Sequence, residues 1–198
     1  MSDPIASLLP GSNIRKLWPT EADAYRDHLL RLDPDSRHRR FSGTVSDEVI
    51  ARHTATIRDF GVVVHGFFID GILRGAAELR LAGLLSRDAE AAFSIEPAWQ
   101  SLGVGTVLLE RTLLAARNRG IRRLQMLCLA DNSRMQQLAR RFAAELTFDF
   151  GSVVGEVGPA RSTPLSLLRE WVGDAYGAAE AVLDAQSTLL LEGGTRRA

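Results

Sequence analysis

The amino-acid sequence predicts a mixed α/β fold, in which helices flank a mainly antiparallel sheet of about six to seven strands. The first observation is a hairpin: the β-branched and aromatic run 62–69 turns at Asp70 and Gly71 into a second strand-like run, 72–81. The second is a strand-turn-helix unit that spans 89–119 and contains a glycine-bearing turn. Strands that alternate with helices indicate helices packed on the faces of a sheet.

The residues before the hairpin predict one strand and two helices. A strand is expected near 14–18, and a helix follows to about residue 32 with Thr20 as its N-cap. Asp33 and Pro34 are expected to end this helix, and the basic run 37–40 to form a loop. A further helix is expected to start at Ser46.

The residues after the hairpin continue the alternation. Strand 89–95 precedes helix 104–119, and Gly120 is a typical helix stop. The expected elements that follow are strand 123–129, helix 132–145, a hairpin or pair of short strands at 147–157, and an appended C-terminal helix within 164–191.

These elements are expected to form one folded domain, since a single core usually organises roughly 100–200 residues. The chain has 198 residues. We expect a flexible N-terminal arm at 1–12, which is rich in small residues and proline, the folded domain at 13–158, and a helical extension at 159–198.

Composition argues against several classes of function. Basic and acidic side chains balance at 24 each, so we expect no extended surface for nucleic acid. No run approaches the roughly 18 apolar residues of a membrane span, and no histidine has partners at zinc-site spacing, so we expect neither a membrane partner nor a metal. The single cysteine, Cys128, forms no internal disulfide and fits a cytoplasmic location.

The turn that contains Gly103 and Gly105 is the strongest functional signal. It opens a helix, so its free backbone N–H groups lie at the positive end of the helix dipole. Glycine also lets the backbone approach a ligand closely. Such a turn binds phosphate, although a tight turn that only starts a helix explains the two glycines equally well.

The residues around this turn match a known pattern. Gln100, Gly103 and Gly105 fit Gln/Arg-x-x-Gly-x-Gly/Ala, and Asn132 heads the helix after the next strand. On these residues the span 90–142 resembles the GNAT acetyltransferase superfamily. The opening, 14–35, resembles the bacterial branch that includes protein lysine acetyltransferases. The resemblance covers roughly 13–157 and implies the GNAT acyl-CoA N-acyltransferase fold.

The resemblance implies that acetyl-CoA is the co-substrate. Backbone amides of the turn would hold its pyrophosphate, strand residues would pair with the pantetheine arm, and a gap beside the next strand would hold the thioester. The residues expected to bind it are Phe93, Ser94, Ile95, Gln100, Ser101, Leu102, Gly103, Val104, Gly105, Thr106, Asn132 and Met135. A plain helix N-cap role explains Asn132 equally well.

Two glutamates are candidates for a general base, which an amine acceptor with a pKa of about 10 requires at neutral pH. Glu90 lies in a segment that resembles the base-bearing strand of bacterial protein acetyltransferases, and Glu78 lies on the preceding strand. We favour Glu90 as the base. The alternative for either glutamate is a solvated or ion-paired carboxylate without a catalytic role. Many relatives place a tyrosine that protonates the leaving thiolate at the position of Ala139, so Ser133 or water is left for this step.

These features predict an N-acetyltransferase that moves an acetyl group from acetyl-CoA to an amine, on either a protein lysine or a small molecule. Two alternatives stay open. One is a GNAT-like module that binds acyl-CoA without catalysis. The other is an assembly component whose C-terminal helix docks on its own domain or on a second copy of the chain, as a homodimer.

Overall fold

The computed structural model describes residues 9, 11–83, 86–129, 131–142, 145–149, 152–156 and 170. The strands are β1 Ser12–Lys16, β2 Val62–Ile69, β3 Ile72–Leu81, β4 Asp88–Ile95, β5 Arg123–Leu129, β6 Glu145–Asp149 and β7 Ser152–Glu156. The helices are α1 Ala22–Arg31, α2 Pro34–Phe41, α3 Asp47–Ala55, α4 Val104–Asn118 and α5 Ser133–Arg141.

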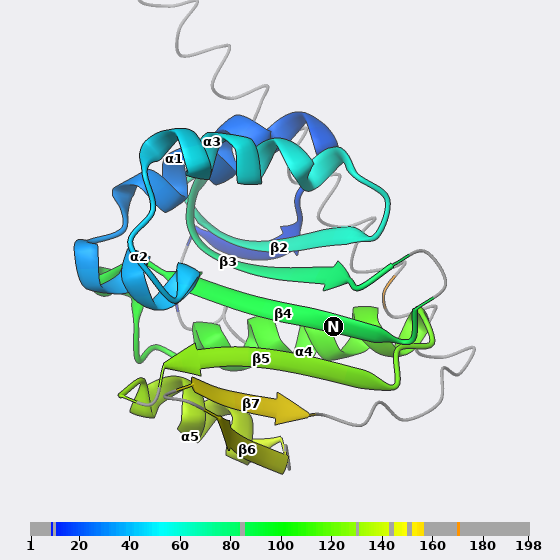
Figure 1. Cartoon of the computed structure of the whole chain (residues 1–198). Helices are drawn as coiled ribbons and strands as arrows, with labels where there is room; N and C mark the ends of the chain where they lie inside the picture. Colours follow the sequence, from blue (N-terminus) through cyan, green and yellow to red (C-terminus); the bar gives the residue numbers. More distant parts are fainter. Residues whose placement is uncertain are drawn as a thin grey trace, which may run out of the picture.

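One sheet contains all seven described strands, in the order β1-β2-β3-β4-β5-β7-β6 (Figure 1). Every neighbouring pair is antiparallel except β4 and β5, which are parallel. The α/β class and the mixed sheet are therefore confirmed. The C-terminal helix expected within 164–191 lies outside the described residues, apart from Glu170.

Local turn chemistry explains the hairpin of β2 and β3, whose bounds are those the sequence predicts. Asp70 and Gly71 both have left-handed backbone conformations, with φ of 48° and 74°. A two-residue turn with positive φ at both positions matches the right-handed twist of the strands that it joins. The hairpin therefore follows from two adjacent residues.

The N-terminal elements differ from expectation in detail. β1 begins at Ser12 because Ser12–Lys16 pairs with β2, from Ile69 back to His65. Thr20 is not the N-cap of α1, since a 3₁₀ turn at Pro19–Glu21 precedes this helix. The carboxylate of Glu21 accepts from the Trp18 amide at 2.7 Å and so satisfies the start of the turn in place of Thr20.

The basic run 37–40 was expected as a loop, and this prediction is wrong: it lies in α2. Asp33 is the N-cap of this helix, with a side chain that accepts from the Ser36 amide at 3.0 Å. Pro34 follows it inside the first turn. Proline is favoured there because its φ suits the helix and its missing N–H would have no partner. Asp33 and Pro34 therefore start a helix after α1 ends.

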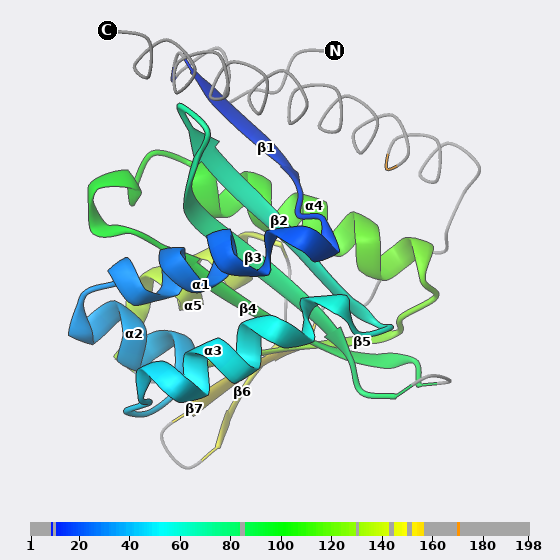
Figure 2. The ribbon, with the colours of Figure 1, turned by 90° about the horizontal axis from the view of Figure 1, so that it is seen from above.

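Two apolar layers hold the helices on the sheet. Helices α1 and α3 pack on one face, where Tyr25, Leu29 and Ile50 meet Val64 and Phe68. Helix α4 packs on the opposite face of the sheet. Figure 2 shows α4 behind the strands, and α1 and α3 in front of them. Among the helices of the described residues, none has both the length and the apolarity that a membrane span requires.

Candidate active site

The parallel strands β4 and β5 separate soon after they meet. They pair over three residues each, Asp88–Glu90 with Arg123–Gln125. Beyond Glu90, β4 stays paired with β3 as far as Ile95, while β5 pairs with β7. Figure 1 shows the two ribbons diverging toward α2. We call this feature the fork. Because a strand bonds on both sides, the edges that face the fork have backbone groups without a strand partner.

The glycine turn lies between the end of β4 and the start of α4. Ser101 and Gly103 are left-handed, with φ of 63° and 84°, and a Cβ added to Gly103 would meet nothing within 4 Å. Gly103 is therefore needed for its conformation, and the space above it is open. The amide of Thr106 donates to the Gly103 carbonyl at 3.0 Å.

Three amides at this helix start remain available. Within the described part of the chain, the N–H groups of Gly103, Val104 and Gly105 have no backbone acceptor. They lie at the positive end of the α4 dipole, and the side chains of Ser101 and Leu102 beside them are exposed. Together they form a cradle for an anion, centred on residues 103–105.

The side chain of Gln100 connects the two arms of the fork. Its Nε2 donates to the Ile95 carbonyl at the end of β4, at 2.8 Å, and its Oε1 accepts from Arg134 on α5. One amide thus ties the turn to both neighbouring elements, which is a positioning role.

Asn132 and Met135 lie across the fork from the turn. The Oδ1 of Asn132 accepts from the Met135 amide at 3.2 Å, so Asn132 caps α5. Met135 packs with the α4 core. The capping role is observed, and it leaves the amide Nδ2 of Asn132 for another contact.

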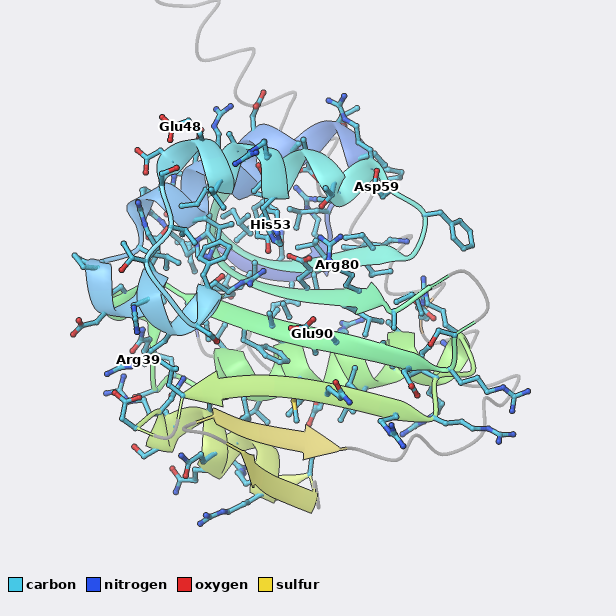
Figure 3. The ribbon with its side chains drawn as sticks, in the orientation of Figure 1. Arg39, Glu48, His53, Asp59, Arg80 and Glu90 are labelled. Atoms are coloured by element: carbon cyan, nitrogen blue, oxygen red, sulfur yellow. The ribbon has the colours of Figure 1, made fainter. Side chains whose placement is uncertain are left out.

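Glu90 lies where the fork begins. It is the last β4 residue that pairs with β5, and it is directly opposite Arg80 on β3 and Gln125 on β5. Its side chain is exposed, on the face that carries α1, α2 and α3 (Figure 3). None of the described residues forms a hydrogen bond or ion pair with its carboxylate.

Glu78, the second candidate base, is buried. Its Oε2 accepts from Tyr25 Oη, Arg40 Nη2 and His53 Nε2, each at 2.7 Å. Its Oε1 accepts from Arg80 at 2.6 Å. Burial alone would raise the pKa of Glu78, but the His53 hydrogen bond and the Arg40 charge hold it well below the ordinary value. A carboxylate held ionised by these donors is a poor proton acceptor.

Comparison with known proteins agrees with this geometry. A model of the acetyltransferase (GNAT) family matches residues 13–144. The chain belongs to the GNAT acetyltransferase family. It is therefore an N-acetyltransferase, and acetyl-CoA is its acetyl donor. No curated protein sequence matches the chain significantly.

Solved structures share the fold. The GNAT domain of S. lividans PAT is 24% identical, with a TM-score of 0.65 over 74% of this chain and 90% of that one. The yncA protein of Salmonella typhimurium, a putative acetyltransferase, is 17% identical, with a TM-score of 0.58 over 77% and 96%. The ribosomal-protein-S18-alanine N-acetyltransferase of Escherichia coli is 14% identical, with a TM-score of 0.59 over 77% and 97%.

Three residues contact Glu78 from the helices: Tyr25 and His53, which the sequence did not single out, and Arg40, which was expected only within the basic loop 37–40. Each comes from a different helix, and Glu78 connects all three helices to the sheet. Arg40 was placed in a loop because Pro34 was interpreted only as a stop. Proline directly after an N-cap residue was the signal for α2. Nothing in the local pattern marks Tyr25 or His53.

The predicted cofactor residues of β4 divide between its two faces. Phe93 and Ile95 pack toward α4. The side chain of Ser94 lies on the other face, where its Oγ is 2.9 Å from His28 Nε2, and His28 Nδ1 is 3.2 Å from Glu96. Side chains of β4 are thus engaged on both faces, and its main chain borders the fork.

Proposed function

We propose that this acetyltransferase acts on a primary amine, with Glu90 as the general base and the turn at 100–106 as the cradle for the pyrophosphate of acetyl-CoA. One observation carries the proposal: an unpaired carboxylate and a set of free helix-start amides lie at opposite ends of one open strand edge. The five-residue step from Glu90 to Ile95 spans about 17 Å. An extended pantetheine arm would lie along this edge.

The chemistry of the cradle fits an anionic donor. Gly103, Val104 and Gly105 offer amides, and no side chain of the described residues fills the space above Gly103. The structure of the Salmonella yncA protein is described with its cofactor acetyl-CoA, which supports the same donor position here. Phe93, Ser94 and Ile95 would contact the arm through their main chain, and Asn132 and Met135 would border it.

The proposed reaction is a direct transfer. Glu90 removes a proton from the acceptor ammonium, and the amine nitrogen attacks the thioester carbonyl. A backbone N–H of β4 at the fork stabilises the oxyanion that develops. The C–S bond breaks, CoA leaves as its thiolate, and the nitrogen, positively charged after the attack, releases its second proton to solvent water to give the amide. Position 139 is alanine, so we assign protonation of the thiolate to water or to Ser133, which is exposed at the start of α5.

The acceptor class is part of the proposal. Fold neighbours include S. lividans PAT and an N-acetyltransferase of a ribosomal protein alanine, and the opening of the chain resembles protein lysine acetyltransferases. Both comparisons support an amine acceptor and leave a protein lysine and a small amine as the two classes to test.

We also propose the division into an arm at 1–12, the acetyltransferase domain at 13–158 and an extension at 159–198. Glu170, the one described residue of the extension, accepts from Arg119 Nη1 at 2.7 Å and from Asn118 near the end of α4.

Calorimetric titration with acetyl-CoA tests the cradle. Gly103→Glu places a negative charge at the proposed pyrophosphate position and should abolish binding. Gly120→Glu is the matched control: Gly120 is also left-handed, with φ of 69° and open space around it, but it lies at the other end of α4. Equal loss in both variants would indicate general destabilisation. Absence of binding to the unmodified protein would refute the proposal, and binding without turnover would favour a module that does not catalyse.

A further inference from the structure

Near Glu90, the side chain of Arg80 has a donor without an acceptor among the described residues. Arg80 donates from Nε and Nη2 to Glu78 Oε1, at 3.0 and 2.6 Å, and from Nη2 to Thr56 Oγ1 at 2.8 Å. These bonds use the Nε hydrogen and both hydrogens of Nη2. Nη1 remains, and none of the described residues accepts a hydrogen bond from it. The side chain is 34% exposed, so this donor is accessible to a ligand.

The charges around Glu78 do not balance. Arg40 and Arg80 both bind the single carboxylate of Glu78, so these three side chains carry one positive charge in excess, and the negative charge of Glu90, which acts on Arg40, lies beside them. The Arg40 side chain is only 6% exposed. The excess is therefore accessible at Arg80, and an anion that reached Nη1 would make a charge-assisted hydrogen bond.

This donor and the proposed base are close together. Arg80 and Glu90 form a directly opposed pair of β3 and β4, and such pairs have Cβ atoms about 4.5–5.5 Å apart. Figure 3 shows His53 of α3, Arg80 of β3 and Glu90 of β4 in succession on the side of the sheet that carries α1, α2 and α3. A small ligand can therefore contact both side chains at once.

We propose that the acceptor is a small amine with a carboxylate within a few bonds of the nitrogen, and that Arg80 Nη1 binds this carboxylate while the amine faces Glu90. The inference rests on the proposed function, since it needs Glu90 on the acceptor side. The supporting argument is charge complementarity: the ammonium of a zwitterion would face Glu90 while its carboxylate faces Arg80. A simple alkylamine would offer no acceptor to Arg80 Nη1.

Matched pairs of acceptors test this inference. We would measure kcat/KM for glycine, β-alanine and 4-aminobutyrate against the amide of each. At least one acid should exceed its amide by roughly 10–100-fold, the value of one hydrogen bond between charged groups. The amino group of each amide is less basic than that of its acid, so the amide would be the better acceptor if the enzyme did not recognise the carboxylate. Arg80→Gln should abolish the preference. Arg52→Gln, which removes an exposed arginine of α3, should retain it.

A second measurement needs no variant, in case Arg80→Gln does not fold. Butyrate should inhibit the wild-type enzyme competitively against the amine and at least about tenfold more strongly than butyramide. Equal rates for acids and amides, or a preference that survives Arg80→Gln, would overturn the inference and leave the proposed function intact. The same conclusion would follow if the enzyme acetylated lysine peptides but none of the amino carboxylates. Failure to acetylate any amine while acetyl-CoA binds would overturn both.

Discussion

The guanidinium of Arg80 binds Glu78 at 2.6 Å, although Glu90 is its directly opposed partner across β3 and β4. Opposite charges at such positions normally attract each other. Here Glu78 holds Arg80 from the same strand, two residues away, and Glu90 remains unpaired at the fork. The buried glutamate thus leaves the exposed one available for the proton transfer that we propose.

Replacing Glu90 by glutamine should lower kcat by about 10²–10⁴-fold, the usual contribution of a general base. The dissociation constant for acetyl-CoA should stay within about twofold, because Glu90 lies at the far end of the fork from the cradle. Steady-state kinetics and calorimetry on the same preparation check this. A kcat within about threefold of the wild-type value would assign the base elsewhere.

Replacing Glu78 by glutamine should destabilise the protein by about 3–5 kcal/mol, because it leaves the Arg40 guanidinium buried without its carboxylate. It should also lower kcat, since Arg80 is then free to bind Glu90. Urea unfolding measures the first effect. Glu110→Gln, at an exposed position of α4, is the control and should change stability by less than about 0.5 kcal/mol. A loss below about 1 kcal/mol for Glu78→Gln would contradict the role of this network.

Replacing Gln100 by leucine should weaken acetyl-CoA binding several-fold and cost about 1 kcal/mol of stability, because the Ile95 carbonyl and Arg134 lose their shared partner. Gln137→Leu, on the exposed side of α5, should leave both unchanged. Calorimetry and thermal unfolding of the two variants give the comparison. Identical acetyl-CoA affinities would show that the turn keeps its shape without this bridge.

Stability should fall as the pH drops below about 6.5, in part through His65. Burial, with nearby Arg111, Arg119 and Lys16, lowers the pKa of His65 to about 3. Between these two pKa values, the unfolded chain binds a proton at His65 that the folded protein does not. The stability from neutral His65 is therefore fully present above the ordinary pKa of histidine and is lost as the pH falls toward the pKa in the folded protein.

His65→Phe should reduce, by about 1 kcal/mol, the free energy of unfolding that is lost between about pH 6 and pH 5. The reason is that uptake of one proton changes this free energy by about 1.4 kcal/mol per pH unit. His28 still contributes to the slope, because burial lowers its pKa as well. Urea unfolding at a series of pH values measures the difference. Parallel curves for the two proteins would show that His65 does not titrate in this way.

The sequence alone determined the elements whose signals are local. Positive φ at Asp70 and Gly71 sets the hairpin, and alternating or helical periodicity marks β5 and α4. The glycine turn was also recognisable, because the need for a left-handed residue at Gly103 and the free amides after it arise within a few residues. The expected positions of Glu90 and of the cradle both follow from such short spans.

The tertiary structure alone decided which candidate glutamate is free. Glu78 and Glu90 are both glutamates on adjacent strands, and no local pattern separates them. Glu78 is buried because it meets Tyr25, Arg40 and His53, which are 53, 38 and 25 residues away in the chain. The fork likewise depends on β5 leaving β4 for β7. Contacts over such separations form when helices and strands pack, so the unpaired Glu90 and the arginines near it are products of packing.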